Sequence, residues 1–373
     1  MIVGLPKEIK TGEYRVGLTP GAVRELCKHG HRVVVERNAG SAIGFHDSDY
    51  QAAGAQLLDT GEAIYQAAEI IVKVKEPQAS EYRLLRPEHI LFAYLHLAPD
   101  RAQLDALLAA KAVAIAYETV TDRHGGLPLL TPMSEVAGRL AVQAGANAME
   151  MKSGGRGVLL GGVAGVLPGK VCVIGGGVVG SNAARMAMGL GADVTILDKS
   201  LARLKQLDER YGGRLKTCYA TDEALEQQAL DADLIIGAVL VPGASAPKLI
   251  SAKLVKRLKQ GTVLVDVAID QGGCFATSRP TSHDRPTYIV DGVVHYCVAN
   301  IPAAVARTAT LALTNATLPY VIALANNGWQ QALSRDEHLR AGLNTCRGDI
   351  CCAAVANAHG MTYTAAEHHL AAP

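Results

Sequence analysis

The chain has 373 residues, of which 49% are hydrophobic and 19% charged, a composition typical of a globular protein large enough for two domains. Its 36 basic and 35 acidic residues leave a formal charge of +1, which offers no electrostatic surface for nucleic acid or an anionic membrane. Eight cysteines without a framework spacing, and an N-terminal MIVGLPKE that lacks the features of a signal peptide, indicate a cytoplasmic protein with reduced thiols.

Strands and helices alternate along the first third of the chain. This alternation predicts an α/β domain with a largely parallel sheet. A further helix is expected to begin at Thr131 as N-cap, with Pro132 in its first turn, and to run to about Met151. The expected strands are 2–5, 32–36, 70–75, 90–97 and 112–117, and the helices lie around 20–29, 59–66 and 100–110.

The segment from Lys170 to Asp198 has the parts needed to hold a dinucleotide. A short apolar strand leads into Gly175, Gly177 and Gly180, which have the G-x-G-x-x-G spacing. The helix that follows points its N–H groups at a phosphate, and the next strand ends at Asp198. An ordinary glycine-rich turn is the alternative, but it does not require the complete order of strand, helix, strand and acid. A carboxylate at this position accepts bonds from ribose hydroxyls and repels a 2′-phosphate, so we expect NAD over NADP.

A second series of strands, 171–174, 194–197, 234–239, 263–268 and 293–298, predicts a doubly wound domain around this turn. After Asn300 we expect no more strands, only helices at 308–326, 328–333, 349–359 and 364–370. The apolar stretch from Thr308 to Ala325 contains Pro319, which favours a buried or subunit-facing helix over a membrane span.

Five polar residues stand at or near the carboxyl ends of expected strands: Arg15, Lys75, His96, Asp270 and Asn300. Ligands bind at that edge of an open parallel sheet. Each residue has an ordinary alternative role, as a surface ion-pair partner, a lysine reaching solvent beside Lys73, a core histidine or a turn former. Their shared placement favours one small-molecule site in a cleft between two domains.

A metal site is not expected. Cys346, Cys351 and Cys352 near His359 match no usual ligand spacing.

Several motifs, in order over nearly the whole chain, resemble the alanine dehydrogenase family, which also includes the transhydrogenase alpha subunit. The resemblance is less diagnostic from about Ser334 onward. It implies two Rossmann-like domains with largely parallel sheets: a discontinuous substrate domain, 1–129 and 307–373, and an NAD-binding domain, 130–306. It also implies a homohexamer. The matching motifs are GLPKEIKTGEYRVGLTP, KVKEP, LHLA, SGGRGVLLGGVAGV, the glycine turn, VAIDQGGC, TSRPTSHD and GVVHYCVANIPAAVARTATLALTNATLPY.

The resemblance also implies roles for individual residues. Arg15 and Lys75 fall at substrate-binding positions, His96 and Asp270 at catalytic positions, and Asn300 in the segment that contacts substrate and nicotinamide. Positions that resemble cofactor contacts are Ser134, Gly175, Gly177, Val178, Val179, Gly180, Asp198, Arg203, Val239, Leu240, Val267, Asp270, Arg279 and Val298.

The sequence departs from the family at a few positions. Ile301 replaces a common methionine and Ala306 a common proline, which affects the fit of the substrate and not the reaction. Ala323 and Asn327 stand where some members carry a carboxylate and histidine metal pair, and this again predicts no metal.

The expected activity is reversible NAD-dependent oxidation of L-alanine to pyruvate and ammonium. Arginine suits a carboxylate, lysine stabilises developing negative charge, and histidine exchanges protons near neutral pH. Three alternatives stay open: another amino-acid or opine dehydrogenase, an NAD(H)-binding module like the transhydrogenase alpha subunit, and a catalytically idle NAD sensor. Arg203, close behind Asp198, could soften the discrimination against NADP.

Overall fold

The computed structural model describes residues 1–239 and 246–370, which fold into two compact units. Unit 1 consists of residues 1–133 and 305–373, and unit 2 of residues 134–304. The boundaries expected from the sequence, 129 and 307, lie within a few residues of these limits. Each unit is described by itself.

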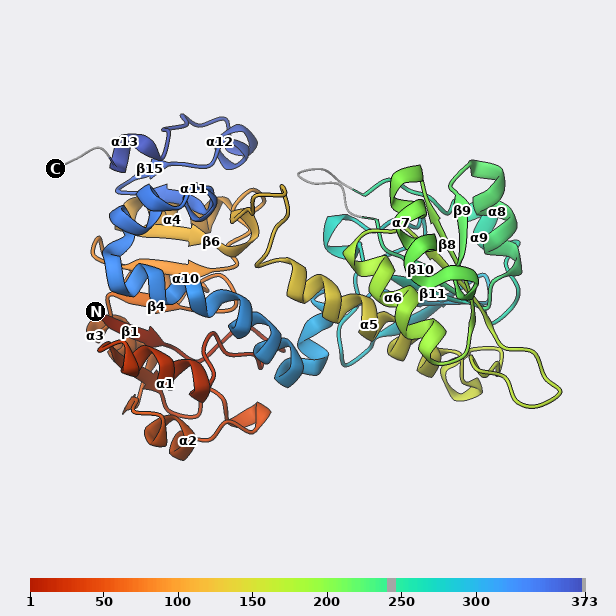
Figure 1. The fold of residues 1–373 in the computed structure, drawn as a ribbon, viewed down its shortest axis with the longest axis horizontal. Helices are drawn as coiled ribbons and strands as arrows, with labels where there is room; N and C mark the ends of the chain where they lie inside the picture. Colours follow the sequence, from red (N-terminus) through yellow and green to blue (C-terminus); the bar gives the residue numbers. More distant parts are fainter. Residues whose placement is uncertain (240–245, 371–373) are drawn as a thin grey trace. The chain divides into compact units, whose positions relative to one another are not determined.

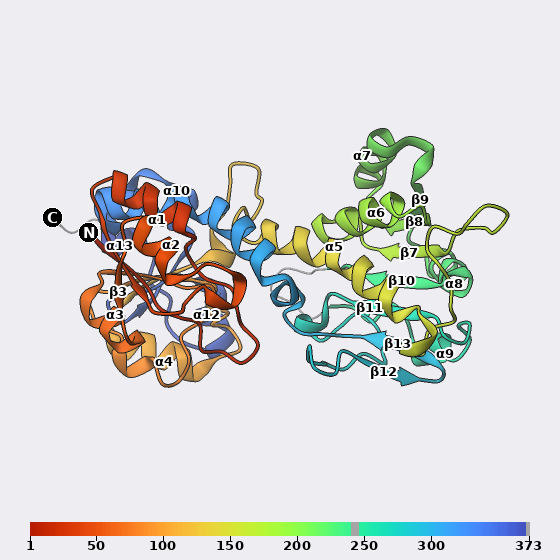
Figure 2. The same ribbon diagram turned by 90° about the horizontal axis from the view of Figure 1, so that it is seen from below.

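Unit 1 contains, within the described residues, an eight-stranded sheet in the order β15-β14-β6-β5-β4-β1-β2-β3, parallel from β6 to β3. Helices α3, α4 and α12 pack on one face, and α1 and α10 lie on the other (Figure 2). The strands are β1 Ile2–Leu5, β2 Arg32–Glu36, β3 Gln56–Leu58, β4 Ile70–Val72, β5 Ile90–Ala93, β6 Val113–Ala116, β14 Leu343–Cys346 and β15 Asp349–Ile350. The helices are α1 Pro20–Lys28, α2 Asp47–Ala52, α3 Gly61–Ala67, α4 Arg101–Ala110, α10 Ala306–Arg335, α11 Glu337–Arg340, α12 Ala353–His359 and α13 Glu367–Leu370.

Unit 2, coloured from yellow-green to cyan in Figure 1, contains, in the part of the chain that the structure covers, a seven-stranded sheet in the order β12-β13-β11-β10-β7-β8-β9 (Figure 2). All neighbours are parallel except β12 and β13. The strands are β7 Lys170–Ile174, β8 Asp193–Asp198, β9 Lys216–Tyr219, β10 Leu234–Gly237, β11 Val263–Asp266, β12 Thr287–Val290 and β13 Val293–Tyr296. The helices are α5 Thr131–Ala148, which begins in unit 1, then α6 Val178–Gly189, α7 Leu201–Tyr211, α8 Asp222–Asp231 and α9 Ala252–Val255.

The two mostly parallel sheets confirm the predicted α/β class. Central strands such as β10 and β11 are buried along their whole length, which explains why their apolar runs were readable from the sequence. Besides the C-terminal hairpin described below, three strands were missed, β3, β9 and β12. Each lies at the edge of its sheet, where partly exposed residues replace the continuous apolar run.

The strand ends were predicted too long. The strands expected at 70–75 and 90–97 end at Val72 and Ala93. Val74, Leu95 and Leu97 beyond these strand ends are nevertheless fully or almost fully buried. The apolar residues of these segments therefore belong to buried loops and not to paired strands. The carboxyl edge of the sheet is therefore covered by well-packed loops.

The expectation that strands stop after Asn300 is wrong, because β14 and β15 form a hairpin that joins the first sheet antiparallel to β6. Its two-residue turn, Arg347 and Gly348, has φ values of 53° and 96°, the mirror-image turn that suits a hairpin. The helix expected over 349–359 begins only at Ala353. Thr131 does start α5, but its hydroxyl donates to the Leu127 carbonyl at 3.0 Å and does not act as the expected N-cap.

Helix α10 contains the long apolar segment. Together with the turn before it, residues 301–335, it is the one helix among the described residues with the length and hydropathy, 1.3, of a membrane span. Ala309, Leu313 and Val321 of this helix are fully buried. Gly328, with φ 73°, interrupts the helix where the sequence predicted a break between 326 and 328.

Candidate active site

Arg15 lies in the loop after β1 and is buried, with 2% of the residue exposed. Its Nε donates to Glu13 Oε1 at 2.8 Å and its Nη2 to Glu13 Oε2 at 2.6 Å, a bidentate pair. Burial alone would lower the pKa of the guanidinium, but the hydrogen bonds and charge of Glu13 hold that pKa above its usual value. Arg15 is therefore a fixed buried cation and not a surface ion-pair partner. It lines a cavity of about 290 Å³ together with Glu13, Lys7 and Lys10.

Lys73 and Lys75 have different environments although they are two residues apart. Lys73 is fully buried, and its Nζ lies 3.1 Å from both Glu8 Oε2 and Glu81 Oε1. The ammonium of half-buried Lys75 has no ion pair or side-chain hydrogen bond within residues 1–239 and 246–370. Burial, and next the positive charge of Arg15, lower the pKa of Lys75. The two carboxylates whose charge acts on Lys75 already pair with other cations, Glu76 with Lys10 and Glu13 with Arg15.

His96 follows β5 in the packed loop at the carboxyl edge. Its side chain is exposed, so the alternative of a core histidine is wrong. Its φ is 50°, a left-handed conformation that is strained for a residue other than glycine. Glu118 holds this backbone, because its Oε1 accepts the N–H of His96 at 2.6 Å and that of Leu95 at 3.1 Å. The imidazole is thereby presented to solvent from a fixed turn.

The glycine turn of unit 2 follows β7. Gly175 has φ 101°, which only glycine adopts without strain. A Cβ on Gly180 would lie 1.8 Å from the Gly175 carbonyl oxygen, so this position needs glycine for helix and strand to pack. A Cβ on Gly177 would meet nothing within 4 Å, and Gly177 caps α6 without a side-chain hydrogen bond. The N-terminal N–H groups of a twelve-residue helix therefore face open space, which fits a phosphate.

Asp198 ends β8 beside this turn. Its Oδ2 accepts the Gly176 N–H at 2.6 Å and its Oδ1 accepts the Ser200 N–H at 2.7 Å. Arg203 Nε donates to the Gly176 carbonyl at 2.6 Å. The negative charge at the strand end is thus fixed by backbone contacts, with one arginine close by.

Asp270 lies in a short 3-10 helix, Ile269–Gln271, after β11. Its carboxylate is exposed and has no hydrogen bond or ion pair in the described part of the chain. The sequence interpretation overlooked Asp266, four residues earlier, which is fully buried inside the apolar run VLVDVA. A charged residue in such a run is the signal that could have identified it.

Glu13 and Glu118 were overlooked as well. Glu13 pairs with Arg15, and Glu118 accepts the His96 N–H. Glu13 lies within the motif GLPKEIKTGEYRVGLTP, but nothing in that motif marks it as the partner of Arg15, and Glu118 lies in none of the motifs.

The remaining predicted positions lie around the same edges of their units. Asn300 has φ 58°, and its carbonyl lies 3.3 Å from His283 Nε2. The Arg279 guanidinium lies 4.2 Å from the centre of the Tyr288 ring. Val178 and Val179 begin α6, Ser134 lies in the first turn of α5, Val239, Val267 and Val298 follow β10, β11 and β13, and Leu240 falls outside the described residues.

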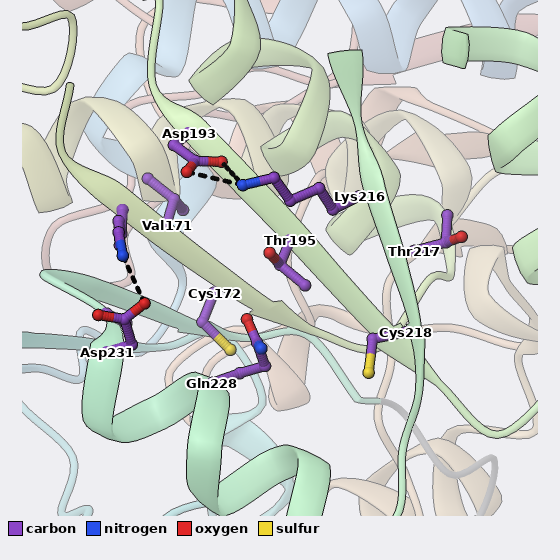
Figure 3. A pocket seen from close by; sticks show the side chains of 11 residues that line it. Val171, Cys172, Asp193, Thr195, Lys216, Thr217, Cys218, Gln228 and Asp231 are labelled. Atoms are coloured by element: carbon purple, nitrogen blue, oxygen red, sulfur yellow. Dashed lines mark hydrogen bonds and ion pairs between the residues drawn. The ribbon is translucent and has the colours of Figure 1, made fainter. Parts of the chain in front are cut away.

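A cavity of about 330 Å³ in unit 2 lies at the opposite, amino-terminal ends of β7, β8 and β9 (Figure 3). Its cations are already paired, Lys216 with Asp193 and Lys170 with Asp231, both at 2.5 Å. It is therefore separate from the strand ends where ligands of open parallel sheets bind. Thr195, Thr217, Cys172, Cys218 and Gln228 also line it.

No group of three or more histidine, cysteine or acidic residues suited to a metal ion occurs among the residues described. His359 instead bonds the Leu97 carbonyl through Nε2 at 2.9 Å.

Comparison with known families matches both halves of the chain. Residues 4–137 match the N-terminal domain model described as "Alanine dehydrogenase/PNT", and residues 141–353 match the C-terminal domain model of the same description.

Known relatives match over the full length. An alanine dehydrogenase of Halomonas elongata is 59% identical, covering 98% of this chain and 99% of the relative. One from Mycolicibacterium smegmatis is 51% identical, covering 100% of both. A solved structure of an L-alanine dehydrogenase has a TM-score of 0.94 and 51% identity over 96% of this chain and 99% of that one. A transhydrogenase structure from Sinorhizobium meliloti, at 24% identity and a TM-score of 0.82, shares the fold.

Proposed function

The chain belongs to the alanine dehydrogenase/PNT family, and from that premise we propose that it is an L-alanine dehydrogenase. The reaction converts L-alanine, oxidised cofactor and water into pyruvate, ammonium, reduced cofactor and a proton, reversibly. The observation that carries this function is the 59% identity to an alanine dehydrogenase across 98% of the chain, which includes both units. The enzyme is an oxidoreductase with small-molecule substrates and a nicotinamide cofactor.

We propose that the cofactor is NAD. The uncapped N-terminus of α6 and the open side of Gly177 fit a pyrophosphate. The carboxylate of Asp198, fixed beside the turn by Gly176, suits the ribose hydroxyls and repels a 2′-phosphate. Bound NAD would supply a hydride acceptor for the substrate carbon, while the protein supplies position and charge.

Unit 1 contributes the groups proposed to hold the substrate carboxylate. Lys75 lies near the buried charge of Arg15, and the carboxylates that act on Lys75 are already paired with Lys10 and Arg15. An anion entering this region therefore gains from both charges. Glu13 already occupies Nε and Nη2 of Arg15, so this side of the guanidinium is not available for a bidentate contact with the substrate carboxylate. Asn300 stays a proposed contact to substrate.

His96 and Asp270 are the proposed acid–base groups. After the hydride leaves, water adds to the imine carbon and ammonia departs. We assign to His96 the proton taken from that water and returned to the leaving amine, because an exposed imidazole can both accept and donate a proton. Asp270 offers an unpaired carboxylate that orients the amine and offsets its positive charge.

We also propose that the protein is a cytoplasmic homohexamer, a proposal supported by the family resemblance and by cysteines without disulfide spacing. Size-exclusion chromatography with light scattering tests the assembly, and a mass other than six chains contradicts it.

The test of the activity is NADH formation when the purified protein is mixed with NAD and L-alanine. Glycine, L-serine and NADP serve as comparisons. We expect the highest kcat/KM for L-alanine with NAD. No turnover of L-alanine contradicts the proposal. NADH binding without turnover of any amino acid would instead indicate a cofactor-binding module or an idle NAD sensor, and turnover of a different amino acid would indicate a related dehydrogenase.

A further inference from the structure

The carboxylate of Asp266 organises the loop that carries Asp270. Asp266 is the last residue of β11 and is fully buried. Its Oδ2 accepts the Cys274 N–H at 2.9 Å, the Phe275 N–H at 3.3 Å and the Ser278 hydroxyl at 2.5 Å. Every donor on this oxygen thus comes from the chain just beyond Asp270.

The other oxygen binds the chain just before Asp270. Oδ1 accepts the Ala268 N–H at 3.1 Å, and the Cys274 thiol lies 3.5 Å from it. A single buried carboxylate therefore holds both ends of the short helix on which Asp270 lies. A buried charge is tolerated only when its oxygens are satisfied, so these contacts are costly to lose.

The backbone also closes tightly around this carboxylate. Gly272 and Gly273 both have left-handed φ values, 87° and 74°. A Cβ on Gly273 would lie 2.7 Å from Asp266 Oδ2 and 2.9 Å from the Cβ of Ser278. The loop can thus take this path only with glycine at position 273 and an acceptor at 266.

Asp270 itself has no side-chain partner in the described residues that could fix its place. Its position is set by its backbone, and the backbone is set by Asp266. We propose that Asp266 is a positioning residue for the proton-transfer and amine-binding role of Asp270. The inference rests on the proposed function, because it takes the role of Asp270 from there.

A double-mutant cycle on the full-length enzyme tests this role, with kcat for L-alanine measured for wild type, Asp266→Asn, Asp270→Asn and the double variant. The carboxamide of Asp266→Asn keeps one acceptor oxygen and turns an NH₂ group toward the remaining donors. We expect kcat to fall by about 10-fold or more, NADH binding to change by less than about threefold, and the double variant to be no slower than Asp270→Asn alone. Effects on kcat that multiply, or an Asp266→Asn enzyme within about twofold of wild type, would overturn the proposal.

Two further variants keep the test decisive if Asp266→Asn does not fold. Ser278→Ala removes one donor from Oδ2 and should lower kcat by a few-fold in the wild-type background but not in the Asp270→Asn background. As a control, Asp233→Asn alters a buried carboxylate at the amino-terminal end of β10, bonded to the Lys170 N–H at 3.0 Å and paired with Arg156. It should lower Tm and leave kcat unchanged.

A wild-type protein without L-alanine turnover would overturn the proposed function and this role with it, whereas multiplying effects in an active enzyme would overturn this role alone.

Discussion

The two units hold their candidate functional groups by different means. Unit 1 holds its buried cations by ion pairs between side chains, Arg15 with Glu13 and Lys73 with Glu8 and Glu81. Its exposed His96 is held through peptide N–H groups. Unit 2 uses the backbone: a turn that only glycine can make, and carboxylates that accept peptide N–H groups. The first arrangement should be most sensitive to the loss of a charge, and the second to the addition of a methyl group. Four substitutions test this contrast.

The largest effect is expected from Lys73→Met in unit 1. The substitution leaves the buried carboxylates of Glu8 and Glu81 without their cation, and breaking a buried pair in this way costs about 3–5 kcal/mol of unfolding free energy. Urea unfolding measures the loss. The matched control is Arg101→Ala, which removes an exposed pair with Asp105 and should cost about 0.5 kcal/mol or less. Similar losses for the two variants would contradict the account of unit 1.

In unit 2, Gly180→Ala should abolish most cofactor binding. The new Cβ would lie 1.8 Å from the Gly175 carbonyl oxygen, so α6 must shift away from β7. We expect the NADH dissociation constant, measured by fluorescence titration, to rise by about 100-fold or more. In Gly177→Ala the Cβ meets no protein atom within 4 Å, so Tm should stay unchanged while NADH binding weakens. If Gly180→Ala bound NADH with wild-type affinity, close packing of α6 against β7 at position 180 would not be required for cofactor binding.

A smaller effect is expected from Asp198→Asn, which removes the charge next to the turn and keeps an acceptor for the Gly176 N–H. The ratio of kcat/KM for NAD to that for NADP should fall by about 10-fold. Arg203→Ala is the opposing control, because loss of the nearby cation should raise that ratio. An unchanged ratio in Asp198→Asn would assign cofactor choice to another residue.

The smallest effect concerns pH. Because the pKa of Lys75 is lowered, the folded protein loses this charge at a lower pH than an ordinary lysine, whose pKa is about 10.4. Between the two pKa values the unfolded chain binds more protons at this site, so Lys75 makes stability rise with pH in that window. Anion binding should change in the opposite sense and weaken as pH rises through the folded pKa.

Pyruvate does not titrate in this range, so its binding to the NADH complex isolates the lysine. We expect its affinity to fall a few-fold at alkaline pH in the wild type and to stay level in Lys75→Arg, since arginine keeps its charge. A fall of equal size in both proteins would exclude Lys75 as the titrating group.

The contrast between the units also explains what the sequence could predict. A backbone turn that requires glycine produces a recognisable spacing of glycines in the sequence. The turn at Gly175 and the acidic residue Asp198 could therefore be predicted from the sequence. Ion pairs between distant residues produce no recognisable spacing in the sequence, and Glu8 and Lys73 are 65 residues apart. Only the fold shows that Lys73, and not Lys75, forms an ion pair with Glu8. Asp266 was overlooked although its charge interrupts the apolar run VLVDVA, because that run was taken only as a buried strand.

The same reasoning applies to the fold. Central strands were recognised because both faces are buried, whereas the edge strands β3, β9 and β12 have mixed exposure and were missed. The hairpin of β14 and β15 depends on pairing with β6, far away in the chain, which no local pattern reveals.

We propose that His96, held in a left-handed turn by Glu118, transfers protons during the oxidation of L-alanine. It is tested most directly by comparing NADH formation by the wild type and by His96→Ala at saturating NAD and L-alanine. We expect the rate of NADH formation to be lower by about 10²–10⁴-fold in His96→Ala, with NADH affinity and Tm unchanged. An equal rate in the two proteins would contradict it.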